Sequence, residues 1–229
     1  LTNKVLAKLA DVVLQAFPSV FNKAITTGNP VRKSICEIRA PEQRQLNHDG
    51  NLRLLVVGGS LGAVKLNEVI PQALSQIEAD KRPSVIHQTG TRNIDAAKAM
   101  YAEVGVEAKV EAFIDDMPSV YEWADLVICR SGAMTVFELA AAGAASILVP
   151  YPYAVDDHQT SNAHYLEDAG AAIIKQQDEL TTDWLVEMIN DFSSNRNKLL
   201  DMAKAARKLA IPDSAKTIAD ACLKAGGVL

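Results

Sequence analysis

Residues 125–163 read DLVICRSGAMTVFELAAAGAASILVPYPYAVDDHQTSNA, and this stretch decides the predicted fold. The apolar run Val127–Cys129 is typical of a strand that is buried on both faces of a parallel sheet. The residues SGAM at 131–134 allow the backbone to turn and to approach a ligand closely. A helix is then predicted from Thr135 to the glycine at 143, and a second strand ends in the proline at 150. The order strand, helix, strand indicates a βαβ unit.

The predicted helix start suits a nucleotide. The first N–H groups of a helix are unpaired and lie at its positive end, so they can bind a phosphate. Glu138 lies three residues after Thr135; its carboxylate would repel a phosphate but could bind the paired hydroxyls of a ribose. The same two residues also fit a capping box, in which both side chains only satisfy backbone N–H groups. The tetrapeptide by itself leaves both interpretations open.

A second polar segment follows in residues 157–163, DHQTSNA, which are predicted to open another helix beside the first. Two helix starts at the carboxyl ends of neighbouring parallel strands form the expected ligand crevice of an open α/β sheet. This arrangement favours a ligand-binding role for Glu138 over the cap alone.

Six segments, in this order and spacing, resemble the MurG-like family of two-domain, nucleotide-sugar-dependent glycosyltransferases of the GT-B architecture. They are GNPVR (28–32), LLVVGGSLGA (54–63), HQTG (87–90), FIDDM (113–117), ADLVICRSGAMTVFELAAAG (124–143) and DHQTSNA (157–163). They extend over nearly the whole chain. Ala145 departs from the family pattern, which often has Pro there, and this affects only the entry to a strand.

The resemblance implies a Rossmann-like, doubly wound parallel sheet that forms the carboxyl-terminal donor domain of an inverting transferase. It implies UDP-N-acetylglucosamine as donor and a lipid-linked muramyl-pentapeptide as acceptor, in peptidoglycan synthesis. It also implies a set of donor-contacting residues that bind the nucleotide, the diphosphate, the ribose and the sugar. These are Arg32, Ser60, Ile114 (through its backbone), Arg130, Ala133, Met134, Thr135, Val136, Phe137, Glu138 and Gln159. No catalytic base is identified, since the family has it in the amino-terminal domain, and no cofactor or metal is expected.

The domain boundaries predicted from this resemblance are residues 1–33, a remnant of the amino-terminal acceptor domain with its hinge, and 34–229, the donor domain. The chain lacks an initiator Met and is expected to begin inside a longer protein, so it should bind donor without turning over alone. Helices are predicted at 1–10, 198–208 and 213–224. A strand without sheet partners is predicted at 11–17, and another strand at 24–27. From residue 51 on, strands at 52–57, 84–89, 108–113, 125–130, 144–150 and 171–176 should alternate with helices.

Composition excludes several classes. The 229 residues carry a formal net charge of −5, with a pI near 5.4, which argues against nucleic-acid binding. No apolar run approaches the ~20 residues of a membrane span. The three cysteines are widely separated and are interpreted as reduced thiols. A cytoplasmic protein is expected, peripheral on the inner face of the membrane that holds its lipid-linked acceptor.

Other patterns favour structural roles. The loop GGSLGA at 58–63 resembles a dinucleotide loop, but the second strand ends in HQTG without the acid that would bind a ribose, which disfavours NAD. His158 and His164 are six residues apart and do not share a helical face for a metal. The acidic pairs at 115–116 and 156–157 are interpreted as helix caps. Two alternatives stay open: another UDP-sugar-dependent transferase of this architecture, or a non-catalytic nucleotide-sugar-binding subunit of a split transferase.

Overall fold

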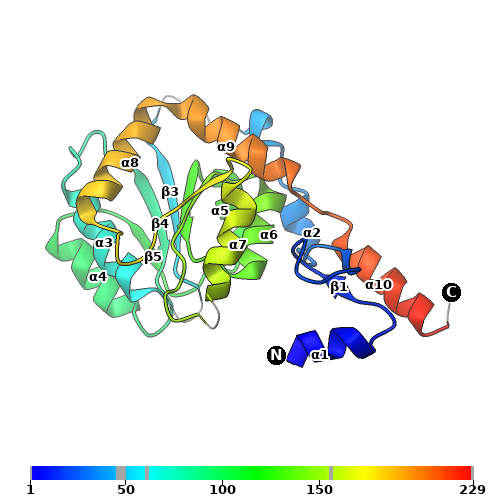
Figure 1. The fold of residues 1–229 in the computed structure, drawn as a ribbon. Helices are drawn as coiled ribbons and strands as arrows, with labels where there is room; N and C mark the ends of the chain where they lie inside the picture. Colours follow the sequence, from blue (N-terminus) through cyan, green and yellow to red (C-terminus); the bar gives the residue numbers. More distant parts are fainter. Residues whose placement is uncertain (1, 45–49, 60–61, 155–156, 228–229) are drawn as a thin grey trace.

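The computed structural model describes residues 2–44, 50–59, 62–154 and 157–227. A six-stranded, wholly parallel sheet with the order β5-β4-β3-β6-β7-β8 lies at the centre of the molecule (Figure 1). Its strands are β3 (Arg53–Val57), β4 (Ser84–Gln88), β5 (Lys109–Glu111), β6 (Leu126–Cys129), β7 (Ser146–Leu148) and β8 (Ala172–Ile174). The order confirms the predicted doubly wound sheet, because the chain runs outward from β3 in one direction and outward from β6 in the other.

Helices cover both faces of this sheet. On one face lie α3 (Val64–Ser75), α4 (Ile94–Glu103) and α8 (Thr182–Ser194), and on the other lie α5 (Met117–Trp123), α6 (Ala133–Ala142) and α7 (His158–Glu167) (Figure 1). Successive strand residues point to opposite faces, so Leu54 packs in one hydrophobic cluster and Leu55 in the other. Both faces are therefore apolar, as the strand sequences predict. Helix α9 (Arg196–Lys208) crosses the amino ends of the strands.

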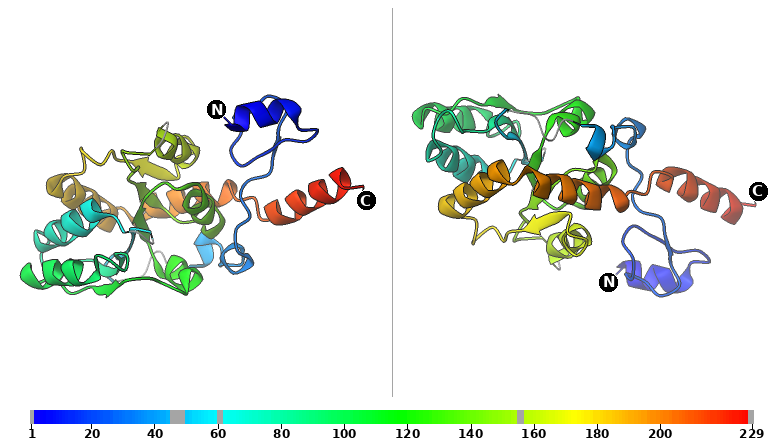
Figure 2. Two further views of the ribbon diagram at one scale, coloured as in Figure 1. Left: turned by 90° about the horizontal axis from the view of Figure 1, so that it is seen from below. Right: turned by 90° about the horizontal axis from the view of Figure 1, so that it is seen from above.

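The amino-terminal segment and the last helix project together from one end of this body (Figure 2). The segment contains α1 (Thr2–Leu9), β1 (Leu14–Gln15) and β2 (Ile25–Thr26), and leads through α2 (Lys33–Cys36) and the 3-10 turn η1 (Pro41–Gln43) to the sheet. The last helix is α10 (Ser214–Ala225). The expectation that the strand at 11–17 lacks partners was wrong, because β1 pairs in parallel with β2. The pairing extends over two residues of each strand.

Most predicted strands are longer than the observed ones. The prediction 144–150, for example, shortens to Ser146–Leu148, and 171–176 to Ala172–Ile174. The difference arises at both ends of the strands, where the chain leaves the ladder to enter the connecting loops. Helix α6 begins at Ala133, two residues before the predicted start at Thr135. None of the helices in the described ranges combines the length and apolarity that crossing a bilayer requires.

A buried ionic network joins the amino ends of the strands to α9. The Asp125 side chain is fully buried, and its Oδ2 accepts from the backbone N–H of Arg53 at 2.8 Å. Its carboxylate also binds the guanidinium of Arg53 at 2.8 Å and that of Arg196 at 3.1 Å. Two arginines compensate one buried carboxylate, so the network is satisfied as a unit. It lies at the end of the sheet opposite the crevice.

Candidate functional site

The candidate site lies where the strand order reverses, at the carboxyl ends of β3 and β6, which is the expected position of the ligand crevice in an open α/β sheet. The glycine loop follows β3, and Arg130, Ser131 and Gly132 follow β6. Gly62 has φ +77°, and a Cβ there would collide with the Thr89 carbonyl and the Asn93 amide. Gly62 is therefore held tightly against the residues that follow β4. Ser60, predicted to contact the phosphates, lies outside the described residues.

The start of α6 presents backbone donors to this crevice. Gly132 is the N-cap residue, without a side-chain capping bond, and its carbonyl accepts the first helical bond from the N–H of Val136 at 3.0 Å. Ala133 and Thr135 are half-buried and the Met134 side chain is 45% exposed. Among the described residues, no protein acceptor takes up the N–H groups of these three residues. These free N–H groups are the kind of donors that bind an anion at a helix start, and the phosphate site stays a prediction.

Glu138 is held by two side chains from other elements. Its Oε1 lies 3.4 Å from Nη2 of Arg32, and its Oε2 accepts from the Tyr121 hydroxyl at 3.3 Å. Arg32 precedes α2, and Tyr121 belongs to α5. The Glu138 side chain is 17% exposed, whereas Arg32 is 54% exposed. The carboxylate is thus mostly buried but keeps some exposed surface, through which it can accept a hydrogen bond from a ligand.

The capping-box interpretation of Thr135 and Glu138 was wrong. Because α6 begins at Ala133, Thr135 lies inside its first turn and Glu138 lies in the second. Glu138 therefore cannot reach the N-cap backbone and binds Arg32 and Tyr121 instead. Burial first, and the Glu138 charge second, raise the pKa of Tyr121 well above its usual value, so this phenol stays a hydrogen-bond donor.

Two predicted contacts, Val136 and Phe137, have side chains that face the protein interior. Val136 is fully buried in the core between the sheet and α5–α7. Phe137 is 2% exposed, and its ring lies 4.9 Å from the ring of Phe17 and 5.3 Å from that of Tyr165. Their burial places these two side chains in the core, and the prediction that positions 136 and 137 contact a ligand stays a prediction. The apolar periodicity of α6 assigns them to the core.

Ile114 is buried, and its backbone N–H donates to Oε1 of Gln88 at 3.1 Å. Gln88 ends β4 and is 4% exposed. We predicted that this N–H binds the edge of the nucleotide base. To do so, the base would have to displace the Gln88 side chain from the Ile114 N–H. Gln88 was not singled out from the sequence, because the two residues are 26 positions apart.

Gln159 and Arg130 meet around the loop after β7. Oε1 of Gln159 accepts from the Tyr151 N–H at 3.0 Å, and the Arg130 guanidinium lies 5.6 Å from the centre of the Tyr151 ring. Arg130 also donates to the carbonyls of Val149 and Pro150, both at 3.1 Å, and to the Gln177 side chain. If Arg130 also binds a diphosphate, as predicted, its guanidinium must do so while it keeps these hydrogen bonds or by giving some of them up. Burial lowers the pKa of Arg130.

The two helix starts are joined directly. Asn162, in the first turns of α7, is 8% exposed, and its amide donates to the Ser131 carbonyl at 3.1 Å. This bond holds the turn that precedes α6.

The two acidic pairs, interpreted from the sequence as helix caps, differ in the structure. Asp116 caps α5 by accepting from the Ser119 N–H at 3.2 Å, whereas Asp157 is the N-cap residue of α7 but makes no side-chain capping bond. Asp156 lies outside the described residues.

Comparison with known proteins agrees with this geometry. A glycosyltransferase from Nitrosomonas europaea, named UDP-N-acetylglucosamine–N-acetylmuramyl-(pentapeptide) pyrophosphoryl-undecaprenol N-acetylglucosamine transferase, is 52% identical over 99% of this chain and 64% of its own length. The protein of the same name from Dechloromonas aromatica is 51% identical over 97% of this chain and 62% of its own length. The chain thus spans less than two thirds of these curated relatives.

A solved structure and a family model complete the comparison. The crystal structure of MurG from Acinetobacter baumannii superimposes with a TM-score of 0.87 at 40% identity, covering 98% of this chain and 63% of that one. The model of the glycosyltransferase family 28 C-terminal domain matches residues 53–218, which include the whole six-stranded sheet. On this match, the chain belongs to the glycosyltransferase family 28 C-terminal domain family.

Proposed function

We propose that this chain is the donor-binding part of an inverting transferase that moves N-acetylglucosamine from UDP-N-acetylglucosamine to a lipid-linked muramyl-pentapeptide. One observation supports the proposal most directly. The Glu138 carboxylate lies in the second turn of α6, next to the unpaired N–H groups of the first turn, and is bound by Tyr121 at 3.3 Å and Arg32 at 3.4 Å. This arrangement offers an anion site and an acceptor for ribose hydroxyls side by side. The names of the relatives, each an N-acetylglucosamine transferase, support the choice of sugar.

The chemistry follows from these groups. When the acceptor hydroxyl attacks the anomeric carbon, negative charge grows on the departing UDP. The N–H groups of Ala133, Met134 and Thr135 are fixed donors that can stabilise this charge without reorganising during the reaction. Gln159, on α7, would contact the sugar hydroxyls. Inversion requires a base for the acceptor proton, and we place that base in the amino-terminal part of the longer protein.

The uracil would bind beside β5. Its edge would take over the N–H of Ile114 from the side chain of Gln88, so one hydrogen bond is exchanged for another. Such an exchange has a small net cost, since both states leave the N–H satisfied. Gln88 then serves to keep this buried donor paired while the site holds no nucleotide.

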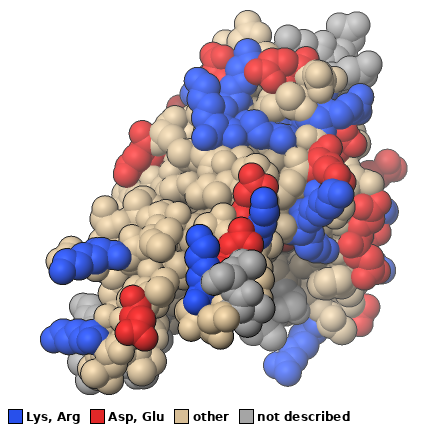
Figure 3. All heavy atoms as spheres, turned by 90° about the vertical axis from the view of Figure 1, so that its right-hand side faces the viewer, with Lys and Arg blue, Asp and Glu red and all other residues tan. Residues whose placement is uncertain are grey.

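We further propose that residues 1–33 are the remnant of the acceptor domain with its hinge and that 34–229 form the donor domain. The amino-terminal segment exposes apolar side chains that an isolated domain would bury, among them Val5, Leu6 and Leu9, which are 54%, 55% and 79% exposed. Figure 3 views the side of the molecule on which this segment and α10 lie, and uncharged side chains cover much of it. We propose that the remainder of the acceptor domain covers this surface in the full-length transferase.

The transferase would act as a peripheral protein at the cytoplasmic face of the membrane, where it meets its lipid-linked acceptor.

Calorimetric titration of this chain with UDP-N-acetylglucosamine, UDP-glucose, UDP and NAD tests the proposal. We expect the N-acetylglucosamine donor to bind best, NAD not to bind, and no transfer to occur. Preference for another UDP-sugar would instead favour a transferase of different donor specificity. Binding of NAD, or of none of the four, would refute the donor-domain assignment. A complete gene that encodes only this chain would favour a subunit of a split transferase.

A further inference from the structure

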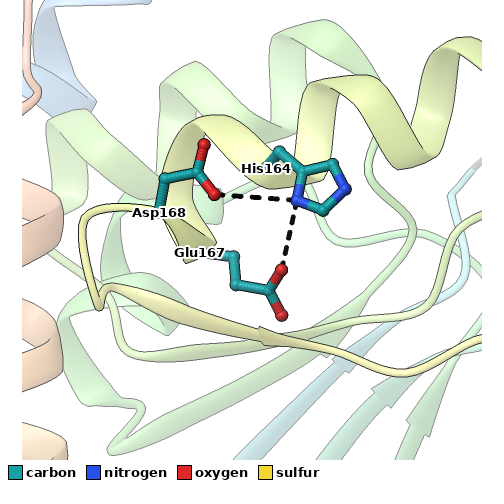
Figure 4. Close-up of side chains that lie close together, drawn as sticks. All are labelled: His164, Glu167 and Asp168. Atoms are coloured by element: carbon teal, nitrogen blue, oxygen red, sulfur yellow. Dashed lines mark ion pairs between the residues drawn. The ribbon is translucent and has the colours of Figure 1, made fainter.

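Three possible metal ligands meet on the last turn of α7, away from the crevice (Figure 4). Nδ1 of His164 lies 3.2 Å from Oε2 of Glu167 and 3.7 Å from Oδ1 of Asp168. The residues are spaced i, i+3 and i+4, which brings their side chains together on one helical face. The three ligand atoms all lie within 4.8 Å of one another. This set does not include His158, the partner considered from the sequence.

The separations fit a single small cation. In a tetrahedral site with metal–ligand bonds of about 2.0–2.2 Å, neighbouring ligand atoms are roughly 3.3–3.6 Å apart. The observed 3.2 and 3.7 Å lie on either side of this range, so the two pairs that include His164 reach it with side-chain shifts of a few tenths of an ångström. The third pair, between the two carboxylates, lies within 4.8 Å and closes by rotation of the exposed Asp168 side chain. A nitrogen with two carboxylate oxygens suits Zn²⁺ or Cu²⁺ better than Mg²⁺ or Ca²⁺, which prefer oxygen ligands only.

The negative charges of Glu167 and Asp168 also favour binding of a cation. Glu167 and Asp168 stand next to each other at the carboxyl end of a helix, where the helix dipole is negative. Within the described residues, the ion pairs of these two carboxylates are with His164 alone, and none involves Lys or Arg. With a neutral imidazole, two negative charges thus face the negative end of α7. A divalent cation would remove this repulsion.

Glu167 is held in position from outside the cluster. Its Oε1 accepts from the backbone N–H of Ile174 in β8 at 3.0 Å, which leaves Oε2 directed at His164. Orientation of a metal-binding carboxylate by a further hydrogen bond is a common feature of metal sites. A pocket of about 410 Å³, lined by His164 and Asp168 together with Phe17, Tyr165 and Leu209, opens beside the cluster. Water in this pocket can complete the coordination.

We propose that His164, Glu167 and Asp168 bind a divalent transition-metal ion of the Zn²⁺ class. The ion would connect the last turn of α7 with β8 through Glu167. It would lie at a surface distinct from the donor crevice, so the proposal is independent of the proposed function.

Titration of the whole chain with ZnCl₂ at pH 7.5, after treatment with chelator, tests this site. We expect one saturable site per chain, weakened at least about tenfold in His164→Ala and in Glu167→Gln. His158→Ala is the matched control, since it removes an exposed histidine from the other end of α7, and Cys222→Ser removes the exposed thiol as a competing ligand. Both should bind like the unmodified chain.

Thermal unfolding supplies a second measurement. Zn²⁺ should raise the melting temperature of the unmodified chain and of His158→Ala, but not that of His164→Ala, because a ligand stabilises only the state that binds it. Absence of saturable binding would overturn the proposal. It would equally be overturned if His164→Ala bound Zn²⁺ as well as the unmodified chain, or if Cys222→Ser abolished binding.

Discussion

Replacement of Glu138 separates its binding role from its structural role. In Glu138→Ala the buried Tyr121 hydroxyl loses its acceptor, and an unsatisfied buried donor costs about 1–3 kcal/mol of unfolding free energy. The lost contact with Arg32 adds little, because that side chain is 54% exposed and solvent screens the pair. If the carboxylate also binds ribose, the affinity for UDP falls by a further, independent amount. A hydrogen bond to a charged group contributes about 1.5–3 kcal/mol, or roughly 10- to 150-fold in Kd.

Glu138→Gln distinguishes the two effects. The amide oxygen still accepts from Tyr121, so this variant should unfold at nearly the same urea concentration as the unmodified chain. Its affinity for UDP should nevertheless fall, by about fivefold or more, because a hydrogen bond to a charged acceptor is roughly twice as strong as one to a neutral acceptor. Glu187→Gln is the matched control, since it removes one exposed carboxylate from α8 on the opposite sheet face. Calorimetry and urea unfolding measure the two quantities; unchanged UDP affinity in both Glu138 variants would refute the reasoning.

Three further predictions concern the framework of the site. Asp125→Ala should lower the unfolding free energy by about 3–5 kcal/mol in urea, since two arginines lose a buried partner, while UDP affinity stays unchanged; a loss below 1 kcal/mol would contradict the network. Gly62→Ala should destabilise the chain by about 1–3 kcal/mol more than Gly59→Ala, because both have positive φ but only at Gly62 would the added Cβ collide with neighbours; equal denaturation midpoints would argue against this packing. Burial lowers the pKa of His87 to about 3, so stability is full above pH 6.5 and falls as the pH drops toward 3. Between pH 7 and 5 the loss should be about 2 kcal/mol, and His87→Gln, measured by urea unfolding at each pH, should largely remove it.

The alternation of strands with helices was predictable because the central strands β3, β6 and β7 are largely apolar runs bounded by Gly, Pro or polar residues. The convergence of two helix starts followed from the same pattern, since all six strands are parallel. What the pattern could not give is the position of the α6 start. Gly132 adopts an extended conformation, with ψ 145°, and the helix begins at once after it. Ala133 and Met134 are good helix formers, so they join α6 instead of forming the turn.

Side-chain contacts between different helices and strands could not be predicted from the sequence, for a different reason. The Tyr121 hydroxyl meets Glu138 because α5 packs beside α6, and Gln88 meets Ile114 because β4 ends beside the loop after β5. Neither pair has a local spacing rule, so no periodicity marks it. Arg130 illustrates the converse case. A cation beside a predicted phosphate site invites an electrostatic role, but in the folded chain its partners are carbonyls at the end of the neighbouring strand.

Helix α6 joins the crevice to the amino-terminal segment through two consecutive residues. Glu138 binds Arg32 and Tyr121, while Phe137 packs its ring against Phe17 at 4.9 Å. Gly28 lies against the same ring: a Cβ built there would be 3.4 Å from Phe137 and 3.0 Å from Ile211, which leads to α10. Gly28 belongs to the connection from the amino-terminal segment, and Ile211 to the connection that leads to α10. The two connections thus meet beside Phe137, on the turn of α6 that also carries Glu138. Because packed side chains resist compression, we expect displacement of either connection to shift the Phe137 ring and, with it, this turn of α6.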